Sequence, residues 1–178
     1  KIEEQFYYKG KLDSLNLGDA STSHKMTLND LFAAQGWPCL NGLTIPIPPI
    51  NNINGDSIPI DANEYFETMD LISGTIEVEI YNGLPFDITD VNLNLSNSNN
   101  NNLILSTTFP IISSNTTVTN TVNISNILIE GNMIAEIQNI NIPGTGTDSI
   151  IINCADSLVA TLTVKDLIIS EATAYWPE

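Results

Sequence analysis

The 178-residue chain has no arginine and a single histidine, and only 15% of its residues are charged. Ordinary soluble domains carry about 25% charged residues. Five lysines stand against twenty-one aspartates and glutamates, which gives a formal net charge of −16. Because nucleic acid is bound by clustered lysine and arginine, we expect no nucleic-acid partner. The same balance argues against docking on an anionic membrane.

Long apolar runs are also missing. Runs such as Ile127–Ile129 and Ile150–Ile152 are far shorter than the roughly 18 residues of a spanning helix, so we expect no direct membrane insertion. The chain does not begin with Met or with a basic segment leading into an apolar one. We expect a mature or excised segment of a longer protein.

Cysteine is scarce, and Cys39 and Cys154 lie far apart in the chain. Their spacing excludes a CxxC redox or zinc motif. Two possibilities stay open at this point: one disulfide that closes a long loop in an oxidising compartment, or two buried thiols.

Asparagine and isoleucine are abundant where charged residues are few: the chain has 23 Asn and 26 Ile. Isoleucine and threonine favour strands, whereas asparagine favours turns and solvent-facing strand positions. A hydrophobic content of 42% in a chain of this length is enough for one packed domain.

The first third of the chain predicts an irregular N-terminal extension over residues 1–69. Gln5–Tyr8 predicts a short strand, and Lys11–Asn16 alternates. Residues 27–34 predict a short helix with Thr27 as N-cap and Asp30 near its positive end. The proline-rich segment from Thr44 to Ile60 predicts an edge strand or a polyproline-like extension.

Residues 70–178 predict a regular β domain. Ile76, Val78 and Ile80 alternate with polar residues, as expected for a strand with one buried face. Similar strands follow, separated by turn signals such as the run around Pro85, and Gly131 with Asn132 predicts a two-residue hairpin. Seven strands without helical periodicity predict an all-β fold, an antiparallel immunoglobulin-like β-sandwich with the irregular extension packed against it.

One segment is similar to known families. Gly74–Ile88 reads as a strand ending at Asn82, a turn with Pro85, and a second strand led by Ile88. It resembles the opening hairpin of the late-embryogenesis-abundant type 14 (water-stress) β-sandwich, and also repeats in uncharacterised envelope proteins of Bacteroidota. The resemblance covers at most residues 70–173. It implies a noncatalytic domain, and no catalytic residue carries over.

Catalytic parts are sparse. His24 is the only imidazole, and no nucleophile motif accompanies it, so we expect a solvent-exposed turn histidine. Acidic residues recur every three positions in a segment that predicts a short helix, and two more follow Pro85. They could serve a glycosidase or hold Ca²⁺, but a solvated acidic face is the favoured interpretation. These acidic residues are Asp61, Glu64, Glu67, Asp70, Asp87 and Asp90.

Most aromatic side chains fall outside the regular strands. They could stack on sugars or anchor a partner, but we expect them to pin the extension to the sandwich, with Trp37 the best core candidate. The residues are Tyr7, Tyr8, Trp37, Tyr65, Phe66, Tyr175 and Trp176. Sequons at Asn94, Asn115 and Asn123 are expected by chance in so asparagine-rich a chain.

These observations predict a noncatalytic scaffold or interaction domain of a secreted or cell-envelope protein, and we expect this protein to be bacterial. The expected partner is an envelope protein or another domain of the parent chain, and we assign no catalytic, cofactor-binding or metal-binding residue. The alternative is a carbohydrate-binding module, with or without structural calcium. A carrier of apolar ligands would need an inner cavity, and the steady alternation favours a filled core.

Overall fold

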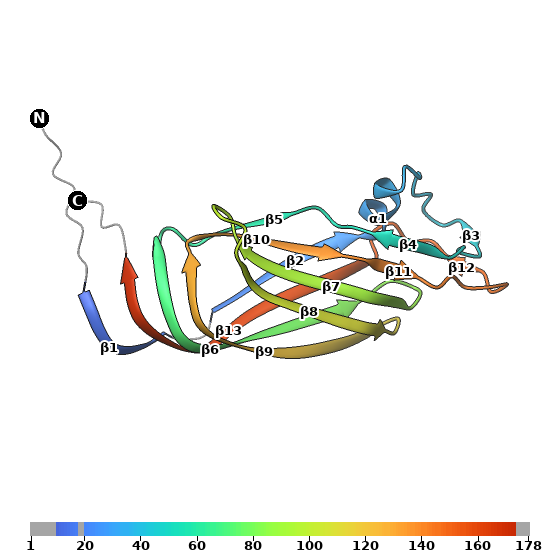
Figure 1. Cartoon of the computed structure of the whole chain (residues 1–178). Helices are drawn as coiled ribbons and strands as arrows, with labels where there is room; N and C mark the ends of the chain where they lie inside the picture. Colours follow the sequence, from blue (N-terminus) through green and yellow to red (C-terminus); the bar gives the residue numbers. More distant parts are fainter. Residues whose placement is uncertain (1–9, 18–19, 174–178) are drawn as a thin grey trace, which may run out of the picture.

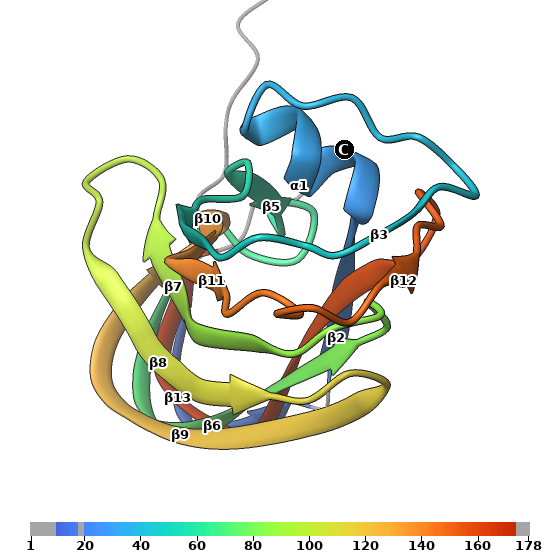
Figure 2. The ribbon, with the colours of Figure 1, turned by 90° about the vertical axis from the view of Figure 1, so that its right-hand side faces the viewer.

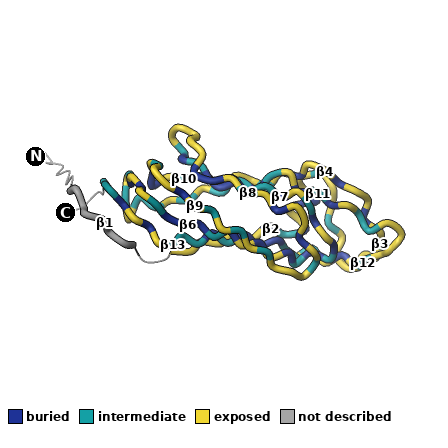
Figure 3. Tube along the Cα trace, turned by 60° about the horizontal axis from the view of Figure 1, so that its bottom comes forward, coloured by how far each residue is buried: buried dark blue, intermediate teal, exposed yellow. Residues whose placement is uncertain are grey.

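A computed structural model of the chain describes residues 10–17, as backbone only, and residues 20–173. The described residues form two antiparallel sheets packed face to face, with one short helix at one end (Figure 1). Buried residues alternate with exposed ones along the strands, which is the pattern of a sandwich with one wet face per sheet (Figure 3). The predicted all-β antiparallel sandwich is therefore confirmed.

The first sheet is four strands wide. Its edge is formed end to end by two strands that pair with different halves of one long strand, and two further strands complete it. In spatial order they are β1 (Gly10–Leu17) with β2 (Ala20–Thr27), then β13 (Ser157–Thr173), β6 (Thr68–Asn82) and β9 (Thr116–Glu130).

The second sheet is also four strands wide, and two of its positions are broken into shorter strands. In spatial order they are β4 (Ile50–Ile53) with β5 (Ile58–Asp61), then β11 (Ile140–Ile142) with β10 (Asn132–Gln138), β7 (Ile88–Asn97) and β8 (Leu103–Ile112). A small separate pair joins β3 (Thr44–Ile45) to β12 (Ile150–Ile151).

The strands pair in a nested order. β7 pairs with β8, β6 with β9, β4 and β5 with β11 and β10, and β2 with β13. The chain thus forms one long hairpin whose tip lies between β7 and β8. This hairpin is rolled up, so that β13 also pairs with β6 and β10 also pairs with β7. This is the connectivity of a jelly roll. The strand order is therefore not the predicted immunoglobulin-like one, in which seven strands divide as ABED and CFG.

Several strands before residue 70 belong to the sheets. β2 lies in the first sheet, and β4 and β5 form an edge of the second. The expected division into an extension over 1–69 and a sandwich over 70–178 therefore does not coincide with the strand pairing. The sequence of β2 lacks the alternation that predicts a strand, because its inward side chains include the polar Thr22 and His24. The expected edge position of the proline-rich segment is confirmed.

Two predicted hairpins are instead crossings between the sheets. β6 and β7, on either side of the Gly83–Asp87 turn, lie in different sheets, as do β9 and β10 on either side of Gly131. A Cβ at buried Gly131 would lie 2.4 Å from the Phe66 carbonyl oxygen, so only glycine fits this crossing. Asn82, which is fully buried, holds the other crossing: its Nδ2 donates to the Phe86 and Ile112 carbonyls, and its Oδ1 accepts from Leu84 N–H.

The first sheet is longer than the second, and its far end curls beside β1 (Figure 1). Within this end Asn126 and Asp166 adopt left-handed backbone, with φ of 51° and 52°, and the β6–β13 register shifts between Lys165 and Ile168. All seven described non-glycine residues with positive φ are asparagine or aspartate. The asparagine-rich composition thus supplies backbone conformations that most side chains disfavour.

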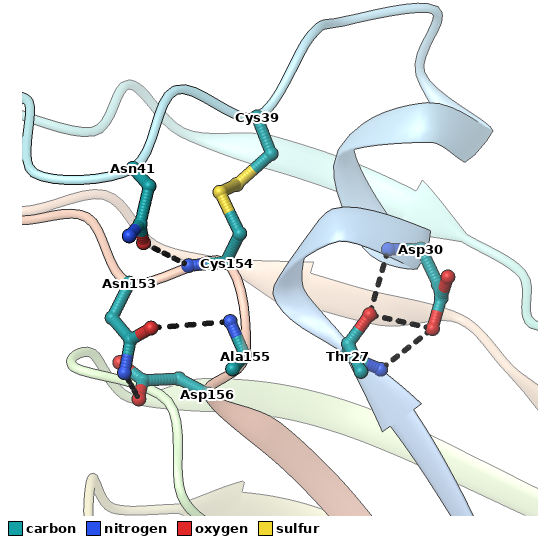
Figure 4. The surroundings of a disulfide bond; sticks show 8 residues. All are labelled: Thr27, Asp30, Cys39, Asn41, Asn153, Cys154, Ala155 and Asp156. Carbon is teal, nitrogen blue, oxygen red and sulfur yellow. Dashed lines mark hydrogen bonds between the residues drawn. A yellow bond between two sulfur atoms is a disulfide. The ribbon is translucent and has the colours of Figure 1, made fainter.

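α1 (Leu28–Ala34) and the β3–β12 pair lie at one end of the molecule (Figure 2). The predicted cap is confirmed, because Thr27 Oγ1 accepts from Asp30 N–H and the Asp30 carboxylate accepts from Thr27 N–H. Cys39 and Cys154, 115 residues apart, form a disulfide that ties the loop after α1 to the loop before β13 (Figure 4). This settles the open question of their pairing.

Candidate functional site

The two long sides of the sandwich differ. On one side β8 and β9 run along each other (Figure 2), and Asn120 Nδ2 bridges them by donating to Thr107 Oγ1 at 2.9 Å and the Thr108 carbonyl at 3.2 Å. On the other side, where β2 and β5 form the edges, a cavity of about 210 Å³ opens between the sheets. The sandwich is thus bridged along one side and open along the other.

The cavity, which we call the cleft, has an apolar floor and a polar rim. Its floor is formed by side chains of β13, β7 and β10, and its rim by β2 and β5. The lining residues are Thr22, Ser23, His24, Ile58, Pro59, Ile60, Asp61, Leu93, Ala135, Ala160 and Leu162.

Two alanines create the cleft. Ala160 of β13 stands between Ile80 of β6 and His24 of β2, and its neighbours in β13 on the same face are leucines. Ala135 of β10 lines the opposite wall. Both alanines are buried, so their missing methyl groups leave empty volume where larger side chains would fill the core. Ala160 follows the alternation of buried residues along β13, but the space also depends on Ala135 in the other sheet.

The sequence predicted that His24 lies in a solvent-exposed turn, and this prediction is wrong. His24 lies within β2 opposite Ala160, half-buried at the cleft rim. No hydrogen bond or ion pair joins it to another described side chain. Thr22, Ser23 and Asp61 line the same cleft, but no hydrogen bond of the imidazole to their side chains is present, so these residues do not show the hydrogen-bonded arrangement of a catalytic triad. An imidazole at the rim can instead donate or accept one hydrogen bond to a bound group.

The predicted helix of acidic residues is wrong. Asp61 ends β5, residues 63–65 form a turn, and Asp70 lies in β6, so these carboxylates share no helix face. Asp61 Oδ1 accepts from the Asn63 backbone N–H at 3.0 Å and thus stabilises the turn. Within residues 20–173, no three His, Cys, Asp or Glu side chains gather closely enough to hold a metal ion.

Asp87 and Asp90 act locally as well. Asp87 accepts from Ser114 N–H at 2.8 Å and ties the crossing after β6 to the loop after β8. Asp90, in left-handed backbone, accepts from Asn141 Nδ2 and Thr89 Oγ1, and these hydrogen bonds hold its pKa below the ordinary value. Both are exposed, so each stabilises a loop or bulge and neither reaches the cleft.

The aromatic residues that the structure describes do not form a platform. Trp37, expected in the core, is 43% exposed, and its ring meets that of Phe32 edge-on at 6.1 Å between ring centroids. Tyr65 is 73% exposed in the turn between β5 and β6, and Tyr81 stands on the outer face near the other end of β6. Phe66 is half-buried against the core. Tyr7, Tyr8, Tyr175 and Trp176, like the strand expected at Gln5–Tyr8, lie outside the described residues.

The three sequons lie on the second and first sheets at unequal exposure. Asn94 is half-buried in β7, whereas Asn115 and Asn123 are exposed, the former in a turn with φ of 54° and the latter on β9. No helix among residues 20–173 is long and apolar enough to cross a membrane.

No protein-family model and no curated protein matches the chain. Solved structures that it resembles in part include that of the infectious bursal disease virus Gx strain, with 10% identity, a TM-score of 0.27, and coverage of 96% of this chain and 42% of that chain. The crystal structure of the infectious bursal disease virus VP2 subviral particle gives 12% identity, a TM-score of 0.27, and coverage of 86% and 40%. The chain thus spans about two fifths of those chains, and at TM-scores this low the matches assign neither a family nor a function.

Proposed function

We propose that the chain is a noncatalytic interaction domain of a secreted or cell-envelope protein, which binds an apolar group of a partner protein in the cleft between β2 and β5. The observation that carries this proposal is the cleft itself. It combines an apolar floor of Leu93, Ala135 and Leu162 with a rim of hydroxyls and the imidazole of His24. Binding sites are commonly built in this way, from apolar walls and a few polar groups that fix orientation.

The setting is supported by the disulfide. Cys39–Cys154 joins two loops across 115 residues, and such bonds persist where the surroundings are oxidising. The net charge of −16 supports solubility outside the cell and electrostatic attraction of basic partners.

The carbohydrate-binding alternative has less support. Sugar sites usually present aromatic rings side by side, and Trp37, Tyr65 and Tyr81 lie on three different segments. Structural calcium has no carboxylate cluster to hold it among the described residues. Both ligands nevertheless belong in the experiment, because each would change the conclusion.

A thermal-shift screen tests the proposal. A ligand that binds only the folded state raises the melting temperature by mass action. Toluene serves as the probe of the cleft, alongside soluble polysaccharides, Ca²⁺ and EDTA. We expect toluene to raise the melting temperature of the wild-type chain and to have no effect on Ala160→Leu, in which the added side chain fills the cleft.

Val159→Leu is the matched control. Val159 is the neighbour of Ala160 in β13 and lies on the outer face of the sheet, so this variant adds a methylene group outside the cleft and should respond like wild type. A toluene shift that persists in Ala160→Leu, or no toluene shift in any variant, would refute the cleft as a binding site. A shift with one polysaccharide alone would favour the carbohydrate-binding module.

A further inference from the structure

We infer that the free edge of β2 binds an extended segment of the partner protein as an added strand, with one apolar side chain of that segment seated in the cleft. This inference rests on the proposed function and names the kind of partner that the site accepts. Its occupant is a segment with alternating apolar side chains and basic flanking residues.

The sheet edges of the molecule are not equally able to pair. The β4–β5 edge carries Pro59, with Pro46, Pro48 and Pro49 just before it, and proline lacks the N–H that a ladder needs. β9 is bridged to β8 by Asn120, and the pairing of β1 contains a register shift. β2 has eight residues, no proline and a continuous register with β13 on its other side. Among the described sheet edges, β2 is therefore a long edge without proline, without a bridging side chain and without a register shift.

The position of the cleft fits a strand added to β2. Thr22 and His24 lie opposite buried Leu162 and Ala160, which places both on the inner face of the sheet beside the cleft. In a strand paired with β2, every second side chain would point to this same face. Main-chain hydrogen bonds would then hold the segment, and the inward side chain would enter the cleft, as in other cases of strand addition.

The size of the cleft selects the side chain. Its volume of about 210 Å³ exceeds the roughly 150 Å³ of an engineered apolar cavity that holds benzene. A leucine or phenylalanine side chain therefore fits, whereas an alanine would leave most of the cavity empty.

Net charge favours a basic partner over a second copy of this chain as the occupant of the β2 edge. Two copies that each carry a net charge of −16 repel each other, whereas a segment with lysines is attracted. The carboxylate at the cleft is that of exposed Asp61 on the rim, where a lysine of the segment can pair with it, and residues 20–27 and 157–164 contain no further carboxylate that docking would bury.

Synthetic peptides test the inference. Each is capped, about nine residues long to span β2, and has lysine at both ends with threonine and valine alternating between them. The central residue is alanine, leucine or phenylalanine, and binding to the full chain is measured by fluorescence anisotropy. We expect the leucine or phenylalanine peptide to bind about tenfold or more tightly than the alanine peptide. Hydrogen exchange of backbone amides within residues 20–27 should slow on binding.

Variants locate the interaction. Ala160→Leu should abolish the preference for a large central side chain, and Val159→Leu should keep it. Ala135→Leu, which fills the cleft from the other sheet, provides the same test if Ala160→Leu does not fold. Each variant is first checked for cooperative melting.

Three results would overturn the strand inference: no peptide binding, binding that ignores the central residue, or exchange protection on β5 or β9 in place of β2. If toluene raises the melting temperature but no peptide binds, the cleft remains a binding site and only the added strand is wrong. If neither probe binds, the proposed function fails too. Concentration-dependent dimerisation in sedimentation that Ala160→Leu removes, without peptide binding, would assign the edge to a second copy.

Discussion

Asn97 of β7 holds Glu130 of β9 across the gap between the two sheets. The Asn97 side-chain Oδ1 accepts from the Glu130 backbone N–H at 2.9 Å, and its Nδ2 donates to the Leu128 carbonyl at 2.8 Å. The Glu130 carboxylate in turn accepts from Asn99 N–H and Asn100 Nδ2. Both residues are buried, so this network fixes the tip of the long hairpin to the end of β9.

Asn97→Ala should destabilise the fold strongly. It leaves the buried Glu130 N–H and the partly buried Leu128 carbonyl without their Asn97 partner, and we expect a loss of about 2–4 kcal/mol in the free energy of unfolding. Urea denaturation measures this loss. Asn94→Ala, on the same strand but half-exposed on the outer face, is the control and should stay within about 0.5 kcal/mol of wild type. Equal effects in the two variants would contradict a special role for Asn97.

Removing the disulfide should lower stability without changing the fold. Cys39 and Cys154 close a loop across 115 residues, and loss of such a constraint costs about 2–5 kcal/mol. The measurement is the melting temperature of the wild-type chain with and without reductant, beside that of Cys39→Ser with Cys154→Ser. Reductant should leave the double variant unaffected, and a wild-type melting temperature that ignores reductant would show that the bond does not form.

The α1 cap should make stability depend on acid pH. Hydrogen bonds from the Thr27 side chain and backbone hold the pKa of Asp30 below its ordinary value. Because the folded-state pKa is the lower one, ionised Asp30 stabilises the fold at neutral pH, and this contribution disappears as the pH falls through the folded pKa. Asp30→Asn should therefore lose less stability than wild type between neutral pH and the acid range, as measured by denaturation across pH.

Thr27 gives an independent check of the same cap. Thr27→Ala should cost about 1 kcal/mol of stability, because the Asp30 backbone N–H loses its acceptor, whereas Thr27→Ser keeps the hydroxyl and should cost far less. A serine variant as unstable as the alanine variant would place the effect in packing of the threonine methyl group.

Asn126 should tolerate glycine but not a β-branched residue. Its φ of 51° is left-handed, and a valine there would cost about 1–2 kcal/mol, while glycine adopts this conformation freely. Chemical denaturation of Asn126→Val and Asn126→Gly measures the difference. Ser125→Val, at the neighbouring exposed position with ordinary backbone, should be near neutral. A destabilised Ser125→Val would show that the β-branched side chain, and not the backbone, is at fault.

The sequence predicted which way strand residues face far better than which strands pair. Alternation at Ile76, Val78 and Ile80 determines the buried face, and all three are buried. It carries no information on the partner strand, so the crossing at Gly131 was read as a hairpin. The helix cap was predictable because Thr27 and Asp30 interact locally.

The cleft could not have been found from one segment alone. Ala160 and Ala135 come from strands in opposite sheets, and the space between them exists only after the sheets pack. The sequence predicts a turn at His24 because a polar side chain on the inner face of an edge strand breaks the apolar alternation. The prediction of a helix from Asp61 to Asp70 is wrong because a spacing of three is typical of a helix, whereas a strand end, a turn and a new strand produce it here.

The nested pairing has a consequence for biosynthesis. β2 and β6 both lie against β13, which is the last described strand of the chain. While the protein is being synthesised or exported from its N-terminal end, these early strands remain without β13 until residues 157–173 emerge. Cys39 likewise has no disulfide partner until Cys154 emerges. Contacts so distant in sequence make folding slow. Until this last strand emerges, the growing chain leaves the isoleucine-rich β6 without one of its two neighbours, and such an unpaired strand edge favours aggregation.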